Sequence, residues 1–238
     1  MKKNNTFKLF TLVAMLFIFA GAGRAQVVSG IYFNALIPTG DFAKDYTGTL
    51  PMGRSNIGSD AVMGIGTYRI GYDFDIYGTI QPFAEASFNW NRISSDNRDA
   101  YEEVMGNDAK NPKYFNIPIL FGINYRYEFM PDMLEAFGEF GLGMDFFKAG
   151  GEKYKITGAN GQVTDYNLKY KLNTGFSWEV GAGVIVKKYF SAGIHYIGYG
   201  NHKMQYTKSS KGDATITNSG EVSRKTLGTL ALRLGFHF

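Results

Sequence analysis

The last nine residues alternate strictly between large apolar and polar or small side chains. The even positions are Leu230, Leu232, Leu234, Phe236 and Phe238, and the odd positions are Ala231, Arg233, Gly235 and His237. Because successive side chains of a β-strand point to opposite faces, this pattern predicts a strand with one apolar and one polar face. A half-buried strand of a soluble sandwich would alternate in the same way, so this strand alone leaves its environment open.

The alternation recurs along the chain and predicts eight strands in all. The segments are 27–36, 61–72, 79–90, 115–128, 134–147, 176–186, 190–197 and 230–238. In each segment glycines and charged or amide side chains occupy the parity opposite the large apolar ones. A soluble barrel would have to expose these glycines, which are poor residues for a solvated strand surface. The pattern instead favours apolar side chains facing lipid and glycines making room in a narrow lumen.

The lengths of the connections support a membrane barrel. Long connections at 37–60, 91–113, 148–174 and 204–224 alternate with short ones at 73–78, 129–133 and 187–189. Outer-membrane barrels pair long external loops with short periplasmic turns, whereas a soluble barrel such as a lipocalin has no reason to alternate so regularly. Since unpaired backbone groups are costly in hydrocarbon, the sheet must also close. We therefore predict an all-β, closed antiparallel up-and-down transmembrane barrel of eight strands, with four long external loops and both mature termini periplasmic.

The N-terminus has the pattern of an export signal. Lys2, Lys3 and Lys8 precede a short apolar run that ends at the small residues around Arg24, which predicts a signal peptide over 1–25 and a barrel domain over 26–238. The signal contributes four of the 25 basic residues and none of the 21 acidic ones, so the mature chain is balanced and suggests no nucleic-acid partner. The chain has no cysteine, which excludes disulfides, thiol nucleophiles and cysteine-ligated zinc.

Six charged side chains fall on the inward parity near mid-barrel. They are Arg69, Glu85, Arg126, Glu139, Glu179 and Arg233. A charge enclosed in a dry lumen needs a partner, so we predict a ladder of Arg–Glu pairs that plugs the barrel. The alternative interpretation is a gated ion path.

The sequence offers no diagnostic catalytic, cofactor or metal motif. The one set of residue types that a hydrolase could use is His202 with Ser209 or Ser210 and Asp213, which lacks fixed spacing. We therefore predict that the protein is not an enzyme and has no cofactor, and we expect His202 to lie in a solvated loop.

Aromatic residues near the expected strand ends predict two interfacial belts. The set assigned to the outer end is Trp90, Tyr114, Phe115, Phe147, Trp178 and Tyr199. Lysines of the later long connections, among them Lys153, Lys155, Lys169 and Lys211, make the outer end basic. Lipopolysaccharide phosphates lie at that level, so we expect outer-membrane lipid and lipopolysaccharide as partners.

The chain resembles the eight-stranded outer-membrane β-barrel domain proteins of Gram-negative bacteria. The resemblance lies in the final strand ending at Phe238, in the Ile37-Pro38-Thr39-Gly40-Asp41-Phe42 stretch, and in Phe115-Asn116-Ile117-Pro118. It implies that the final strand, with Leu230, Leu232, Leu234, Phe236 and Phe238, is the signal read by the barrel-assembly machinery.

This family includes adhesins, stability proteins, narrow pores and secretion-system parts. We accordingly expect a monomeric, non-catalytic outer-membrane protein whose surface loops bind a partner or stabilise the envelope. The alternatives are a narrow pore for ions or small apolar molecules, or a component of an outer-membrane secretion machine.

Overall fold

The computed structural model describes residues 27–41, 43, 59–72, 74–75, 78–93, 99, 102, 113–157, 161–211 and 215–238. The segment 1–25, interpreted above as a signal peptide, lies outside them and stays a prediction. No helix among these residues is long and apolar enough to cross a membrane.

The described chain is built from β-strands. They are β1 (Val27–Gly40), β2 (Ser59–Tyr72), β3 (Phe74–Asp75), β4 (Thr79–Ile93), β5 (Lys113–Met130), β6 (Leu134–Ala149), β7 (Glu152–Thr157), β8 (Val163–Tyr170), β9 (Asn173–Val186), β10 (Phe190–Lys211) and β11 (Thr215–His237). Eight of them, β1, β2, β4, β5, β6, β9, β10 and β11, correspond to the eight predicted strands.

The eight long strands pair antiparallel with their neighbours, and the pairing returns to its start. It runs from β1 through β2, β4, β5, β6, β9 and β10 to β11, and β11 pairs in turn with β1. In that last pairing Asn34 lies opposite Arg233 and Ala35 lies opposite Leu232. Because each of these strands has a partner on both sides, the predicted up-and-down arrangement of eight strands is confirmed.

Short turns join strands at one end of the barrel. Met133 N–H donates to the Met130 carbonyl, and Asp132 has a φ of 58°. Between β9 and β10, Tyr189 N–H donates to the Val186 carbonyl while Lys187 and Lys188 both have positive φ, which is the pattern of a type I′ hairpin. The C-terminus and the start of β1 lie at this same end, since Gly30 pairs with His237.

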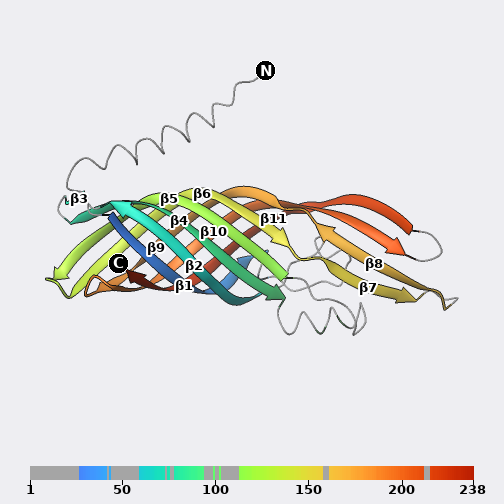
Figure 1. The fold of residues 1–238 in the computed structure, drawn as a ribbon, viewed down its shortest axis with the longest axis horizontal. Helices are drawn as coiled ribbons and strands as arrows, with labels where there is room; N and C mark the ends of the chain where they lie inside the picture. Colours follow the sequence, from blue (N-terminus) through green and yellow to red (C-terminus); the bar gives the residue numbers. More distant parts are fainter. Residues whose placement is uncertain are drawn as a thin grey trace, which may run out of the picture.

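At the other end the structure corrects the prediction of four long loops. The connection expected at 148–174 contains the β7–β8 hairpin, and the one expected at 204–224 continues β10 and β11 as paired strands. β8 pairs with the outer part of β10, so these segments form a four-stranded sheet beyond the barrel in the order β7, β8, β10, β11. We name it the external sheet; it consists of β7, β8 and the paired segments 204–211 of β10 and 215–222 of β11. Figure 1 shows this sheet projecting from the barrel along the long axis of the molecule. The other two expected loops, 37–60 and 91–113, lie mostly outside the described residues.

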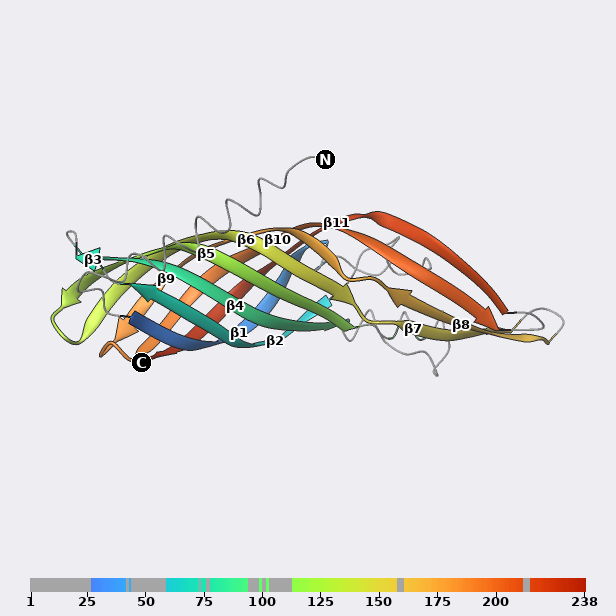
Figure 2. The ribbon, with the colours of Figure 1, turned by 45° about the horizontal axis from the view of Figure 1, so that its top comes forward.

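The residue types explain why the external segments form strands. Tyr154, Tyr166, Leu168 and Tyr170 lie at alternating positions of β7 and β8, which is the period of a strand with one apolar face. The turned view in Figure 2 shows the resulting sheet curving away from the barrel rim.

Candidate functional site

Arg233, in the middle of β11, anchors a buried charge cluster in the lumen. Only 2% of it is exposed, and it contacts three carboxylates from three other strands. Its Nη1 lies 2.8 Å from Glu179 Oε1 and 3.2 Å from Glu139 Oε1, and its Nη2 lies 3.2 Å from Glu85 Oε1. Its Nε donates to Asn34 Oδ1 at 3.0 Å. The guanidinium therefore ties β11 to β1, β4, β6 and β9 across the barrel.

His195 of β10 completes the cluster. Its Nδ1 lies 2.7 Å from Glu179 Oε1 and 3.1 Å from Glu139 Oε1, and all three side chains are buried. The three groups lie close enough together to hold a metal ion. Arg233 already places a positive charge against both carboxylates, so a metal would have to displace it. The geometry thus favours a structural charge cluster.

Of the two remaining predicted lumen charges, Arg126 lies apart from this cluster. Arg126 and Glu135 are both buried and form a separate pair, with Nη1 3.6 Å from Oε2. The backbone of Arg69 lies opposite Glu85 in the β2–β4 register, while its side chain is outside the described part of the structure. Among the described side chains, the charges form a cluster around one arginine and a second pair, and the place of Arg69 in the predicted ladder stays a prediction.

A polar network that the sequence analysis missed lies farther toward the external sheet. Asp145 of β6 accepts a hydrogen bond from Asn116 Nδ2 at 2.7 Å and lies 3.1 Å from His202 Nε2. Both Asp145 and His202 are fully buried. Asp145 shares the inward parity of Glu139 on the same strand, and that parity is the signal that could have found it.

The prediction that His202 lies in a solvated loop is therefore wrong. It is buried because β10 continues as a strand to Lys211 and turns this side chain inward. Its ring pairs with Asp145, whereas Ser209 Oγ donates to the backbone carbonyl of Asn167. Asp213, the third member of the considered hydrolase set, lies outside the described residues. The geometry brings no nucleophile to this histidine among the described residues.

Three aromatics assigned to the outer lipid belt are inside the barrel instead. Tyr114, Phe147 and Tyr199 are fully or almost fully buried, in a cluster with Tyr154, Leu168 and others. Each shares the inward parity of its own strand, as Asn116, Asp145 and His195 do. We name this group of side chains the outer cluster; its members are Leu36, Tyr114, Phe147, Ala149, Tyr154, Leu168, Tyr170, Ile197, Tyr199, Leu227 and Ala231. It fills the lumen on the side of the charge cluster that faces the external sheet.

The hairpin β7–β8 contributes to the outer cluster from above the rim. Tyr154 and Leu168 are buried in it, and the Tyr170 hydroxyl donates to the Glu152 carboxylate. The rings of Tyr154 and Tyr166 stack with centroids 5.1 Å apart. One face of the external sheet is thus continuous with the barrel interior, and the other face turns outward.

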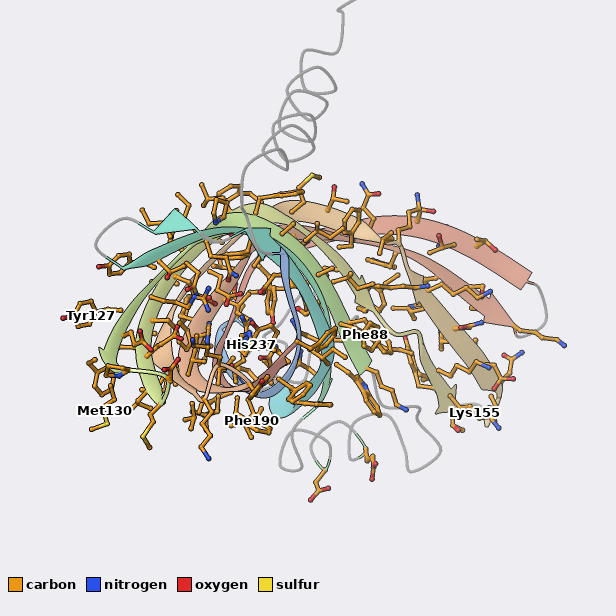
Figure 3. All side chains as sticks on the ribbon, turned by 60° about the vertical axis from the view of Figure 1, so that its left-hand side comes forward. Phe88, Tyr127, Met130, Lys155, Phe190 and His237 are labelled. Carbon is orange, nitrogen blue, oxygen red and sulfur yellow. The ribbon has the colours of Figure 1, made fainter. Side chains whose placement is uncertain are left out.

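The outer wall of the barrel carries large apolar side chains. Leu234 is 63% exposed, Ile194 58% and Phe140 51%, whereas the inward-facing Leu120 is fully buried. In Figure 3, Tyr127, Met130 and Phe190 point away from the barrel while His237 points into it. The predicted distribution of apolar side chains outside and charges inside is confirmed for the described mid-barrel residues of β4, β5, β6, β9, β10 and β11.

No protein-family model and no curated protein matches the chain. Among solved structures it is similar to a major outer membrane protein from Thermus thermophilus, with 10% identity over 90% of this chain and 100% of that one and a TM-score of 0.43. It is also similar to OprG from Pseudomonas aeruginosa, with 12% identity over 89% and 94% and a TM-score of 0.40. For Neisserial surface protein A the identity is 10% over 91% and 100%, with a TM-score of 0.39. At such identities and TM-scores, function has to be argued from the geometry of this chain.

Proposed function

We propose that this protein is a non-conducting, non-catalytic barrel of the outer membrane that holds a four-stranded sheet outside the cell. The observation that carries the proposal is the inversion of the barrel. Large apolar side chains such as Leu234, Ile194 and Phe140 are exposed on the outer wall, while Arg233 and three carboxylates are enclosed. In water such a surface would aggregate, whereas in a bilayer it is the expected one.

The filled lumen supports a structural role over a pore. The charge cluster around Arg233 occupies mid-barrel, and the outer cluster closes the side toward the external sheet. A lumen eight strands wide is just large enough for its own side chains to fill. An ion would have to break the Arg233 cluster and then pass a plug of buried tyrosine and phenylalanine rings.

The two ends of the barrel favour one orientation. The short turns and the C-terminus lie at the end that we assign to the periplasm, and the external sheet lies at the end that we assign to the cell surface. Lys113 and Lys148 follow the apolar wall at the surface end, and Lys113 Nζ lies 5.3 Å from the centroid of the Trp90 ring. We propose that these lysines contact lipopolysaccharide phosphates, because cations near an anionic headgroup layer stabilise the binding of a protein to the membrane.

The proposal is tested by conductance and by fractionation. The purified full-length protein, reconstituted in a planar bilayer, should give no single-channel events. A variant in which Tyr154 and Tyr170 are both changed to Ala should also stay silent, because the Arg233 cluster still blocks the lumen. Discrete conductance steps from the wild-type protein would overturn the non-conducting barrel.

Fractionation tests location separately. The protein should sediment with the outer membrane, and protease added to intact cells should cut the external sheet and leave the C-terminus intact. Recovery in the soluble periplasmic fraction would overturn the membrane assignment. Stoichiometric co-purification of other envelope proteins in mild detergent would instead favour the secretion-machine alternative.

A further inference from the structure

The outward face of the external sheet contains a groove that the proposed function does not use. The groove has a volume of about 630 Å³ and crosses β7, β8 and the outer part of β10. Its lining residues are Lys153, Tyr154, Lys155, Asp165, Tyr166, Asn167, Ser209, Ser210 and Lys211. Figure 3 shows Lys155 on this part of the sheet, away from the barrel.

The strand register shows which side of the sheet the groove opens on. Residues directly opposite one another share a face, and successive residues alternate. Tyr154 pairs with Tyr166, which pairs with Ser210, and Tyr154 is buried toward the outer cluster. The flanking rows must therefore point outward. One row is Lys153, Asn167 and Ser209, and the other is Lys155, Asp165 and Lys211.

These two rows form the walls of the groove, and the middle row of Tyr154, Tyr166 and Ser210 lines it between them. Rows two residues apart along a strand are separated by about 7 Å, and a row that crosses three strands is about 10 Å long. The walls carry three ammonium groups, one carboxylate, one amide and one hydroxyl. Lys153 and Lys155 lie at the β7 end of the groove, and Lys211 lies at the β10 end, so its two ends are positive.

The chemistry of the walls selects a class of ligand. The outward residues described on β7, β8 and the outer part of β10 include no aromatic side chain on which nucleotide bases could stack. Ammonium, amide, hydroxyl and carboxylate groups together suit a ligand with many hydroxyls and regularly spaced negative charges.

We propose that this groove binds a chain of an acidic polysaccharide. Lys155 and Lys211 share one wall, and their separation across three strands is comparable with the repeat of a disaccharide. One acidic group per disaccharide would thus place successive carboxylates at the two ends of the groove. Asn167, Ser209 and Asp165 would hydrogen-bond to the sugar hydroxyls between them. The inference rests on the proposed function only in that the sheet must face the outside of the cell.

The test is binding of hyaluronate oligosaccharides, which carry one carboxylate per disaccharide, to the purified full-length protein in detergent. Isothermal titration calorimetry should detect saturable binding that weakens as salt is added. Neutral dextran of the same length should not bind. A variant with Lys153, Lys155 and Lys211 changed to Gln should lose affinity by about tenfold or more, since each exposed contact contributes modestly.

Two further variants keep the result interpretable. Lys171, Lys187 and Lys188 lie outside the groove, and changing all three to Gln removes the same charge while leaving the affinity unchanged. Asp165→Asn removes the one negative charge of the groove and should strengthen binding about two- to threefold. A gain of this kind is not expected from damage to the fold. Unboiled electrophoretic mobility reports the folded barrel in each variant.

The remaining outcomes overturn the inference. The first is that dextran binds as tightly as hyaluronate. The second is that the two triple variants lose affinity for hyaluronate equally. The third is that poly-glutamate binds as tightly as hyaluronate. All of these outcomes are measured on purified protein, so none of them bears on the outer-membrane location or on the absence of conductance. Those two proposals are tested separately by fractionation and by planar-bilayer recording.

Discussion

Arg233 binds Glu179 with both ends of its guanidinium. Nη1 lies 2.8 Å from Oε1, and Nη2 lies 3.2 Å from Oε2. The same two nitrogens also contact both oxygens of Glu85, at 3.3 and 3.2 Å. A planar guanidinium can make such two-point contacts and a lysine ammonium cannot, so the cluster requires arginine at this position.

Removing this guanidinium should destabilise the barrel strongly. Arg233→Met leaves the Glu85, Glu139 and Glu179 carboxylates buried without their shared guanidinium, and a broken buried pair costs about 3–5 kcal/mol. Urea unfolding in lipid vesicles, followed by tryptophan fluorescence, measures the free energy of unfolding. Arg233→Lys should recover only part of the loss.

A double-mutant cycle separates this cause from loss of packing. Adding Glu179→Gln to Arg233→Met removes one of the unpaired buried charges. The double variant should therefore lose less free energy of unfolding than the sum of the losses in the two single variants. Strict additivity would contradict a direct Arg233–Glu179 interaction.

Gly181 should be intolerant of even one methyl group. A Cβ built at Gly181 would clash with His195 Nδ1, the atom that contacts Glu179 and Glu139. Gly181→Ala must therefore push the imidazole out of the charge cluster, and overpacking of this kind costs about 1–3 kcal/mol. Gly138→Ala is the matched control, because its Cβ would meet nothing within 4 Å. Equal unfolding free energies for the two variants would contradict the tight placement of His195.

The lipid-facing wall should reject a charge that the external sheet accepts. Ile194 and Ile156 are both exposed, at 58% and 45%, but only Ile194 lies on the barrel wall. Ile194→Arg should cost about 2–4 kcal/mol, because Ile194 adjoins His195 of the mid-barrel charge cluster and so lies near the middle of the bilayer. Ile156→Arg should leave the free energy of unfolding nearly unchanged. If both substitutions were neutral, the wall would face water and the protein would not span a membrane.

Alternation was enough to predict the eight barrel strands and the inward position of Arg233, Glu85, Glu139 and Glu179. It could not predict that the carboxylates converge on one arginine, since this depends on the stagger between strands that are distant in sequence. The inward positions of Tyr114, Phe147 and Tyr199 followed from the same parity. These three residues were nevertheless assigned to the outer belt, because aromatic residues at strand ends are typical of the membrane interface.

The external sheet was missed for a different reason. β7 and β8 are short, and lysine, threonine, acidic residues and asparagine make up eight of their fourteen residues, so they resemble loop segments when read alone. They form strands because their tyrosines and Leu168 can pack onto the outer cluster, and because β8 pairs with β10. Neither contact is visible from local composition.

The final residue should matter for assembly and little for stability. β11 ends at His237, and Phe238 is 60% exposed, with its ring centroid 6.0 Å from that of Phe236. Deleting Phe238 removes no strand pair, so the purified protein should refold into vesicles with an unchanged free energy of unfolding. We propose that the last strand is the assembly signal, and this predicts that the deletion lowers the amount of protein in the outer membrane severalfold in cells. Phe190→Ala, which removes a similarly exposed aromatic from the same end, is the control and should assemble normally. If the deletion accumulates in the outer membrane at the level of the wild type, the assembly machinery does not read this residue.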